Sequence, residues 1–308
     1  MGSERGQGTV EWVGTLLIVS VAMLALVAAG VRVPGTALAR AVADRLLCAA
    51  SLADGCGDEP ALIAAYGSEV GKLVREHMPS LVFEQGSRAV PVDFRRCRST
   101  ECGDGPEDGL VHRTDERLPV TAFVHVVDCR EEAAEETEAA GADCSGKRAG
   151  NLYVQYWTYY ANSATLRGMP IVGTKGYHDD DWEGVQLRFG PDGQVDERAS
   201  SHNGYNSEPG GPSNWGSDMG SSVAKGVVEL VGARGHNGWA EETHLLFVSG
   251  GSHAGNTMDL VDIDRYTPGR RVHLIPLEDV AATSTAHFAI SPPWLKKVWL
   301  DPEAEGTS

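Results

Sequence analysis

Positive charge is scarce in this 308-residue chain. Lysine and arginine number 26 against 43 aspartates and glutamates, the net charge is −17 with neutral histidines, and no basic run interrupts the acidic background. Such a field repels phosphate-rich surfaces, so we expect no nucleic-acid partner. Hydrophobic residues make up 42% of the chain and charged residues 22%, a composition typical of a folded protein rather than a disordered one.

The sequence also lacks the paired C-x-x-C knuckles of structural zinc sites. The short loops between neighbouring cysteines instead favour disulfides that join each cysteine to the next one along the chain. Such bonds form in an oxidising compartment, so they would place the domain outside the cytoplasm. The six cysteines fall as three pairs of near neighbours with seven, four and fourteen residues between them: Cys48 and Cys56, Cys97 and Cys102, and Cys129 and Cys144.

The longest uncharged stretch runs over the 20 residues from Trp12 to Val31. As a helix it rises about 30 Å, which matches the hydrocarbon core of a bilayer. A cleaved secretory signal peptide is the alternative, but its apolar region is usually shorter and follows positive charge. Here Arg5 is the only basic residue ahead of the run, and Glu11 abuts it. We therefore expect a transmembrane anchor helix over residues 7–33.

Residues 5–14 (RGQGTVEWVG) resemble the class III leader of Flp-type pilins. The resemblance implies a leader over residues 1–6, cleaved between Gly6 and Gln7 by a prepilin-type peptidase, with Glu11 as the fifth mature residue. It also implies the pilus assembly machinery as a partner. The alternative is a plain signal anchor, which implies neither the prepilin-type peptidase nor the assembly machinery. Either way we expect a single-pass protein of a bacterial cytoplasmic membrane, or of the cell surface, with its C-terminal domain outside.

The exported part divides into a helical and a β-rich region. Residues 36–53 and 60–77 carry apolar side chains at mixed three- and four-residue spacing, which predicts helices and a helical stalk over 34–78. After Pro79 come short β-branched and aromatic runs bounded by Gly, Pro and Asp, without helices between them. Residues 79–308 are therefore expected to form an antiparallel, jelly-roll-like β-sandwich. The runs are SLVFE, RAVPVDF, PVTAFVHVV, LYVQYWTYYA, GVQLRF, THLLFVSG and RVHLIPL.

An acidic run, His178-Asp179-Asp180-Asp181-Trp182-Glu183, enters the predicted strand 184–189. Because side chains alternate along a strand, Asp181 and Glu183 share the face of the apolar residues that follow. Carboxylates on a core face need a cation, a proton or basic partners. With His178 in the entering turn, the H-x-x-D-x-E pattern suits Ca²⁺ or Mg²⁺ first, then Mn²⁺, and Zn²⁺ if more histidines join.

Two further histidines lie in turn-rich segments that follow strand-like runs. They are His202 in Ser201-His202-Asn203-Gly204 and His253 in Gly251-Ser252-His253-Ala254. Each could bring its ring to the same end of a sandwich, where Ser252 and Tyr177 would be additional ligand-binding candidates. The remaining loop histidines, His112, His236, His244 and His287, are expected to be ordinary surface residues.

Four elements in order resemble the family of necrosis-inducing-like proteins and their vacuolar-sorting-type relatives, over about residues 77–260. They are the opening strands from His77, the aromatic strand from Tyr156, the H-x-x-D-W-E run, and the pair of loops with the patterns S-x-H-x-G and G-S-H-A. The resemblance implies a β-sandwich that holds a divalent cation at one end through His178, Asp181 and Glu183. It implies that a glycan or a glycolipid headgroup is the ligand.

The chain departs from the toxin branch of that family. The toxins read G-H-R-H-D-W-E where residues 177–183 read YHDDDWE, and loop 163–170 supplies no match for their upstream aspartate. Fold and metal therefore carry over better than toxicity. Two alternative functions remain. One is a pilus-associated subunit or adhesin, and the other is a metal-dependent hydrolase. No general base for a hydrolase is identifiable in the sequence, which argues against an enzyme. A glycan-binding site would open into a groove lined by Tyr177, Trp215 and Trp239.

Overall fold

The computed structural model describes residues 58–85, 87, 89–98, 118–164, 177–201, 204–205, 239–248, 250–251, 253–257 and 263–304. By its internal contacts the chain divides into two units, Met1–Ala53 and Asp54–Ser308, and all described residues belong to the second. No described helix is both long and apolar enough to cross a bilayer. The predicted leader and anchor lie outside the described residues and stay predictions.

The described chain is mainly β and forms two sheets. The larger sheet has the strand order β11-β2-β3-β4-β5-β6, with β7 paired to β5, and the smaller sheet has the order β10-β1-β8-β9. The strands of the larger sheet are β2 Thr121–Asp128, β3 Leu152–Ala164, β4 Tyr177–Phe189, β5 Val195–Ser201, β6 Gly204–Tyr205, β7 Ala240–Glu241 and β11 His273–Pro276. Those of the smaller sheet are β1 Ser80–Glu84, β8 Leu245–Val248, β9 Gly255–Asn256 and β10 Ile263–Thr267.

The two sheets contain mixed strand directions, which corrects the predicted all-antiparallel sandwich. Strand β1 pairs with β8 in parallel, and β2 pairs with β11 in parallel, whereas the other pairings are antiparallel. In each parallel pair the partners lie far apart in the sequence, so a long connection can return the chain to the same end of the sheet. The short runs that predicted strands carry no information about such long-range pairing.

Strand β3 is the centre of the larger sheet, and every residue from Leu152 to Ser163 is buried. On one face an aromatic cluster covers it: Phe94, Phe123, Tyr159, Trp182, Phe288 and Trp294. On the other face Tyr156 Oη donates to the Val74 carbonyl at 2.8 Å, and the Tyr160 ring stacks on His253. Strand β3 is thus covered on both faces, as expected of a strand whose apolar and aromatic residues fall on both.

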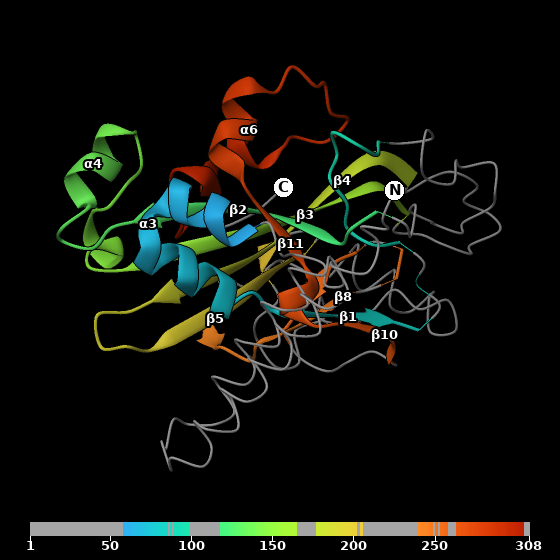
Figure 1. Cartoon of the computed structure of the whole chain (residues 1–308), viewed down its shortest axis with the longest axis horizontal. Helices are drawn as coiled ribbons and strands as arrows, with labels where there is room; N and C mark the ends of the chain where they lie inside the picture. The colour runs from blue at the N-terminus through green and yellow to red at the C-terminus, as the bar shows by residue number, and fades with distance from the viewer. Residues whose placement is uncertain are drawn as a thin grey trace, which may run out of the picture. The chain divides into compact units, whose positions relative to one another are not determined.

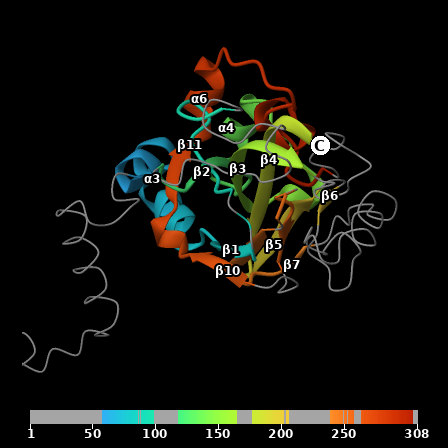
Figure 2. The ribbon, with the colours of Figure 1, turned by 90° about the vertical axis from the view of Figure 1, so that its right-hand side faces the viewer.

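The layers can be followed in the figures. Helix α6, Leu277–Thr283, lies above β2, β3 and β4 of the larger sheet and β1, β8 and β10 lie below these three strands (Figure 1), and Figure 2 shows the same order for α6, β1 and β10. A further short helix, α4 Ala134–Ala139, follows β2. The site residues of β4 therefore lie in a sheet with protein on both sides.

Helix α3, Asp58–Glu76, corresponds to the second predicted helix but does not form a stalk in the part of the chain that is described. Its Leu62, Val70 and Val74 are buried in the same core cluster as the central strands. The Tyr66 hydroxyl donates to the Val124 carbonyl of β2 at 2.7 Å. Helix α3 therefore packs on the β-rich core, and the predicted domain boundaries stay predictions.

One predicted disulfide lies wholly within the described residues. Cys129 and Cys144 are bonded, with Cα atoms 5.1 Å apart, and both are buried beside Val127 and Tyr153. Cys97 is also disulfide-bonded. Its predicted partner Cys102 lies outside the described residues, as do Cys48 and Cys56, so these pairings stay predictions.

Replacing both Cys129 and Cys144 with serine should lower the free energy of unfolding by about 3 kcal/mol, because the bond closes a loop with a sequence separation of 15. Denaturant unfolding of the double variant measures the loss. Peptide mapping without reductant should recover the two cysteines in one linked fragment. A double variant as stable as the wild type would contradict a stabilising role for this bond.

Strand β5 buries a carboxylate that the strand runs of the sequence do not predict. Glu197 is fully buried, and its Oε2 accepts bonds from the Thr243 backbone N at 2.8 Å and from Thr243 Oγ1 at 3.1 Å. Burial raises the pKa of Glu197 to about 7, the bonds from Thr243 oppose this, and the charge of Glu242 adds to it. The folded state therefore holds a proton here that the unfolded chain loses at lower pH.

The pKa of Glu197 makes a pH-dependent prediction. Because the folded pKa lies above the unfolded value, stability should fall as the pH rises from about 4.5 to about 7, by at most about 3 kcal/mol. Glu197→Gln keeps an acceptor for Thr243 but cannot ionise, so it should remove this fall and be more stable than the wild type at pH 8. Chemical denaturation at several pH values tests this, and parallel pH profiles for the two proteins would contradict it.

Candidate functional site

The acidic run 178–183 lies within β4 rather than in a turn that enters it. The strand begins at Tyr177, seven residues before the predicted start at Gly184, because β3 continues to Ala164 and pairs with it throughout. In this register His178 lies opposite Ser163, and Asp181 lies opposite Tyr160. Backbone pairing with β3 therefore fixes the run, and His178 cannot swing as a turn residue would.

Asp181 is brought together with His253, its candidate partner from the G-S-H-A loop. Asp181 is 6% exposed and His253 1% exposed, and His253 Nδ1 lies 2.8 Å from Asp181 Oδ2. The imidazole stacks on the Tyr160 ring with 4.0 Å between centroids and 7° between planes. The loop itself is held to β1, because the Gly250 backbone N donates to Glu84 Oε2 at 2.5 Å. A buried imidazole and a buried carboxylate thus share one contact.

Glu183 lies two residues further along β4, at the point where β5 separates from it. The ladder between these strands ends at Val185 and Ala199. Beyond it, Ser200 Oγ donates to Glu183 Oε2 at 2.9 Å and accepts from the Gly184 backbone N at 2.5 Å. Glu183 is only half-buried, so its carboxylate is the more accessible of the two.

A lysine that the sequence patterns did not indicate acts on both carboxylates. Burial lowers the pKa of the Lys296 ammonium, whereas the charges of Glu183 and Asp181 oppose that shift. Lys296 Nζ also lies 5.9 Å from the centroid of the Trp157 ring. The carboxylates therefore have a built-in positive neighbour, supplied by a segment more than 100 residues later in the chain.

His178 is held by backbone carbonyls. Its Nδ1 lies 2.9 Å from the Asp180 carbonyl oxygen and 3.3 Å from that of Asp179. A carbonyl oxygen can only accept, so Nδ1 carries the hydrogen and Nε2 keeps a lone pair in the neutral ring. Metal-binding histidines are commonly oriented in this way by a carbonyl bonded to the other ring nitrogen.

The described residues contain one group of three His, Cys, Asp or Glu side chains whose ligating atoms all lie within 4.8 Å of one another, and it does not include His178, Asp181 or Glu183. Ligation of a metal by these three residues therefore stays a prediction. Two additional candidates, His202 and Ser252, lie outside the described residues, and the side chain of Tyr177 is not described.

Trp239 does not line a groove at this site. Its ring lies over Arg198, 4.3 Å from the guanidinium carbon, and its Nε1 donates to Glu303 Oε2 at 3.0 Å. It packs near Tyr153, seven residues along β3 from the Tyr160 that contacts His253. Trp239 therefore forms no wall of the groove that a glycan-binding site would need, and Trp215 lies outside the described residues.

No protein-family model matches the sequence, and a search of curated proteins finds no match either. Among solved structures, NLPPya in complex with mannosamine is 15% identical, with 74% of this chain and 86% of that chain covered and a TM-score of 0.40. Necrosis and Ethylene inducing Protein 2 from the causal agent of cocoa's Witches Broom disease is 18% identical, with 68% and 75% covered and a TM-score of 0.36. These similarities are distant, and they show no function of this chain.

Asp180, between the candidate ligands, has a different environment. It is 2% exposed and has the left-handed backbone angle φ of 59°. Its carboxylate accepts from Arg98 Nη2 at 2.9 Å, from Tyr159 Oη at 2.6 Å and from the Ala289 backbone N at 2.8 Å. These donors come from three separate segments, so Asp180 ties the flanking chain to the sheet. The acidic run alone does not distinguish this structural aspartate from Asp181.

The Arg98–Asp180 pair predicts a stability difference between two neighbouring arginines. Arg98→Met leaves a buried carboxylate with one cationic partner fewer and should cost about 3 kcal/mol. Arg95→Met, which removes a half-exposed guanidinium paired with Asp93, should cost less than about 1 kcal/mol. Denaturant unfolding measures both, and adding Asp180→Asn to Arg98→Met should recover part of the loss. Equal losses for the two arginine variants would refute the assigned role of Asp180.

Proposed function

We propose that the β-rich domain binds a divalent cation through Asp181, Glu183 and His178, and uses it to hold a sugar-bearing ligand. The ligand class is a glycan or a glycolipid headgroup, as the motif resemblance implies. Ca²⁺ or Mg²⁺ is the expected ion because two of the three ligands are carboxylates. His253 orients Asp181 through their shared contact, and a bound cation would supply charge to attract hydroxyl oxygens of a sugar.

The observation that carries the proposal is the placement of two acidic side chains in the middle of β4, among buried neighbours. Asp181 is 6% exposed and Glu183 is half-buried. Carboxylates in such places are retained where they are paired or bind a cation. The hydrogen bond from His178 Nδ1 to the Asp180 carbonyl supports the proposal further, because it leaves Nε2 as a potential ligand.

Lys296 offers the competing way to neutralise this site. Its charge acts on Glu183 and Asp181, so a metal ion there would lie in the field of a half-buried lysine. The two cations should therefore oppose each other. Removing the lysine charge should strengthen metal binding if the proposal is right, and should only destabilise the fold if Lys296 alone neutralises the carboxylates.

We also propose that this domain works outside the cytoplasmic membrane of a bacterium, anchored by residues 12–31. The Cys129–Cys144 disulfide supports an oxidising compartment, since such bonds rarely persist in the cytosol. The anchor, cleavage after Gly6 and any pilus association are carried by the sequence pattern. N-terminal sequencing of the membrane-extracted protein should find Gln7 first if the leader is cleaved as proposed.

A pair of opposite charge changes tests the metal site. Asp181→Asn should weaken Ca²⁺ or Mg²⁺ binding at least tenfold, whereas Lys296→Met should strengthen it, because one change removes an attractive charge and the other a repulsive one. Asp192→Asn is the matched control, since Asp192 lies exposed in the turn after β4 and caps Gln194. Calorimetric titration of chelator-treated protein measures all four affinities. Binding that is unchanged by both charge variants would contradict the proposal.

Sugar binding requires a separate measurement. The probes are mannosamine and glucosamine, the sugars held in two of the distantly similar structures. Saturation-transfer NMR on the metal-loaded protein should detect one of them, and addition of chelator or Asp181→Asn should abolish the signal. A signal that persists without metal would place the sugar elsewhere, and release of the free sugar from a glycoside of either probe would indicate a hydrolase.

A further inference from the structure

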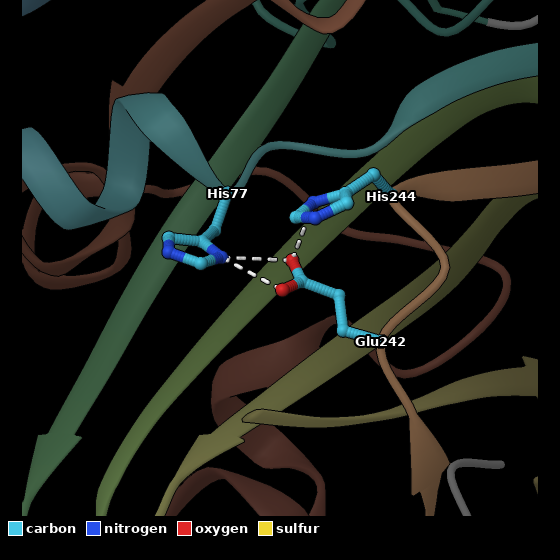
Figure 3. A group of neighbouring side chains, drawn as sticks. All are labelled: His77, Glu242 and His244. Carbon is cyan, nitrogen blue, oxygen red and sulfur yellow. Dashed lines mark hydrogen bonds and ion pairs between the residues drawn. The ribbon is translucent and has the colours of Figure 1, made fainter. Parts of the chain in front are cut away.

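A second cluster of potential ligands lies outside the β4 site. The His77 cluster consists of His77, Glu242 and His244, whose ligating atoms lie within 4.8 Å of one another (Figure 3). His77 Nδ1 lies 2.9 Å and 2.8 Å from the two carboxylate oxygens of Glu242, and His244 Nδ1 lies 3.0 Å from Glu242 Oε1. Two imidazole nitrogens thus converge on one carboxylate.

The backbone holds each member of the cluster in place. The His77 N donates to the Leu73 carbonyl at the end of α3 at 2.9 Å, and the Glu242 N donates to the Val195 carbonyl of β5 at 3.1 Å. The His244 carbonyl accepts from the Ser80 N of β1 at 3.0 Å. Residues about 165 positions apart in the sequence are therefore fixed against one another by the sheet framework.

Two local features aim the side chains. The edge of the His77 ring packs on Phe189 at the end of β4, with 4.9 Å between ring centroids and 89° between planes. His244 has a left-handed φ of 59°, which a residue with a Cβ adopts at a cost and which the bond to Ser80 maintains. Thr243 between the two loop ligands is anchored by Glu197. The arrangement of the three side chains of the His77 cluster is thus fixed by their surroundings and does not result from flexible surface side chains.

The cluster has room for an ion and for a further ligand. Ligand atoms of a tetrahedral zinc ion lie about 3.3 Å apart, so the contacts of 2.8 to 3.0 Å need to open by only about 0.4 Å. The Glu242 side chain is 6% exposed and that of His244 is 62% exposed. Both line a cavity of about 470 Å³ together with Gly193, Gln194 and Val195. Water could therefore complete the coordination.

We propose that His77, Glu242 and His244 form a binding site for a first-row transition-metal ion, with Zn²⁺ as the expected ion. Two imidazoles and one carboxylate are the donors that Zn²⁺ selects, whereas Ca²⁺ and Mg²⁺ prefer all-oxygen sites. The ion would link the end of α3 to the β7–β8 loop and so stabilise the fold when bound. This site is independent of the one proposed on β4.

The test uses Co²⁺ as a spectroscopic substitute for Zn²⁺ in the chelator-treated full chain. The wild type should show visible absorption bands of a nitrogen-ligated Co²⁺ ion, which one equivalent of Zn²⁺ removes and excess Ca²⁺ does not. His244→Ala and Glu242→Gln should each weaken Zn²⁺ binding at least tenfold, and the exposed His244 can be replaced without loss of core packing. Glu241→Gln, which changes the neighbouring carboxylate of the same cavity, should bind Zn²⁺ like the wild type.

The two proposed sites are distinguished with Asp181→Asn. If the His77 cluster binds Zn²⁺, this variant keeps the cobalt bands and the zinc-dependent rise in melting temperature, whereas His244→Ala loses both. Bands that survive in His244→Ala but vanish in Asp181→Asn would overturn the assignment, since the ion would then occupy the β4 site. Absence of bands in the wild type would overturn it as well and leave a hydrogen-bonded triad.

Discussion

Two consecutive buried aspartates in β4 constrain the rest of the structure. Asp180 and Asp181 are 2% and 6% exposed, and each carboxylate needs partners that β4 itself does not supply. Arg98 and the Ala289 backbone N meet Asp180, and His253 meets Asp181. The segment that carries Arg98, the segment that carries Ala289 and the loop that carries His253 are thereby tied to the larger sheet. Polar and charged contacts hold them there as well as apolar packing.

The two aspartates differ in what their surroundings permit. Asp180 is saturated by a guanidinium, a phenol and a backbone N–H, so it has a structural role. Asp181 shares its site with the more accessible Glu183 and with an imidazole. Lys296 offsets part of this negative charge, although its own partial burial lowers the pKa of its ammonium. The same carboxylates could exchange the ammonium for a divalent ion, which makes the middle of β4 a site whose cation can change.

The extent to which the fold follows from the sequence differs between elements. Strand β3 is confirmed, since its apolar and aromatic run is long and both faces are buried. Strand β5 escaped prediction because it buries Glu197 and Arg198, whose partners lie elsewhere in the chain. The parallel pairings of β1 and β2 depend on strands that arrive much later, and local patterns cannot predict them.

The same distinction applies to the candidate sites. The contact between Asp181 and His253 joins two motifs that the sequence had already singled out. Lys296 has no motif and reaches the carboxylates only through the path of the C-terminal segment. His244 was expected to be an ordinary loop residue, because nothing near it in the sequence indicates His77. Clusters assembled from distant segments need the fold before they can be recognised.

The central claim, that the carboxylates in the middle of β4 hold a divalent cation, is tested most directly by anomalous scattering from crystals grown with Mn²⁺. The account predicts an anomalous peak within ligand distance of Asp181 and Glu183, with the Lys296 amine moved away from them. A map with Lys296 bonded to these carboxylates and no peak beside them would contradict it.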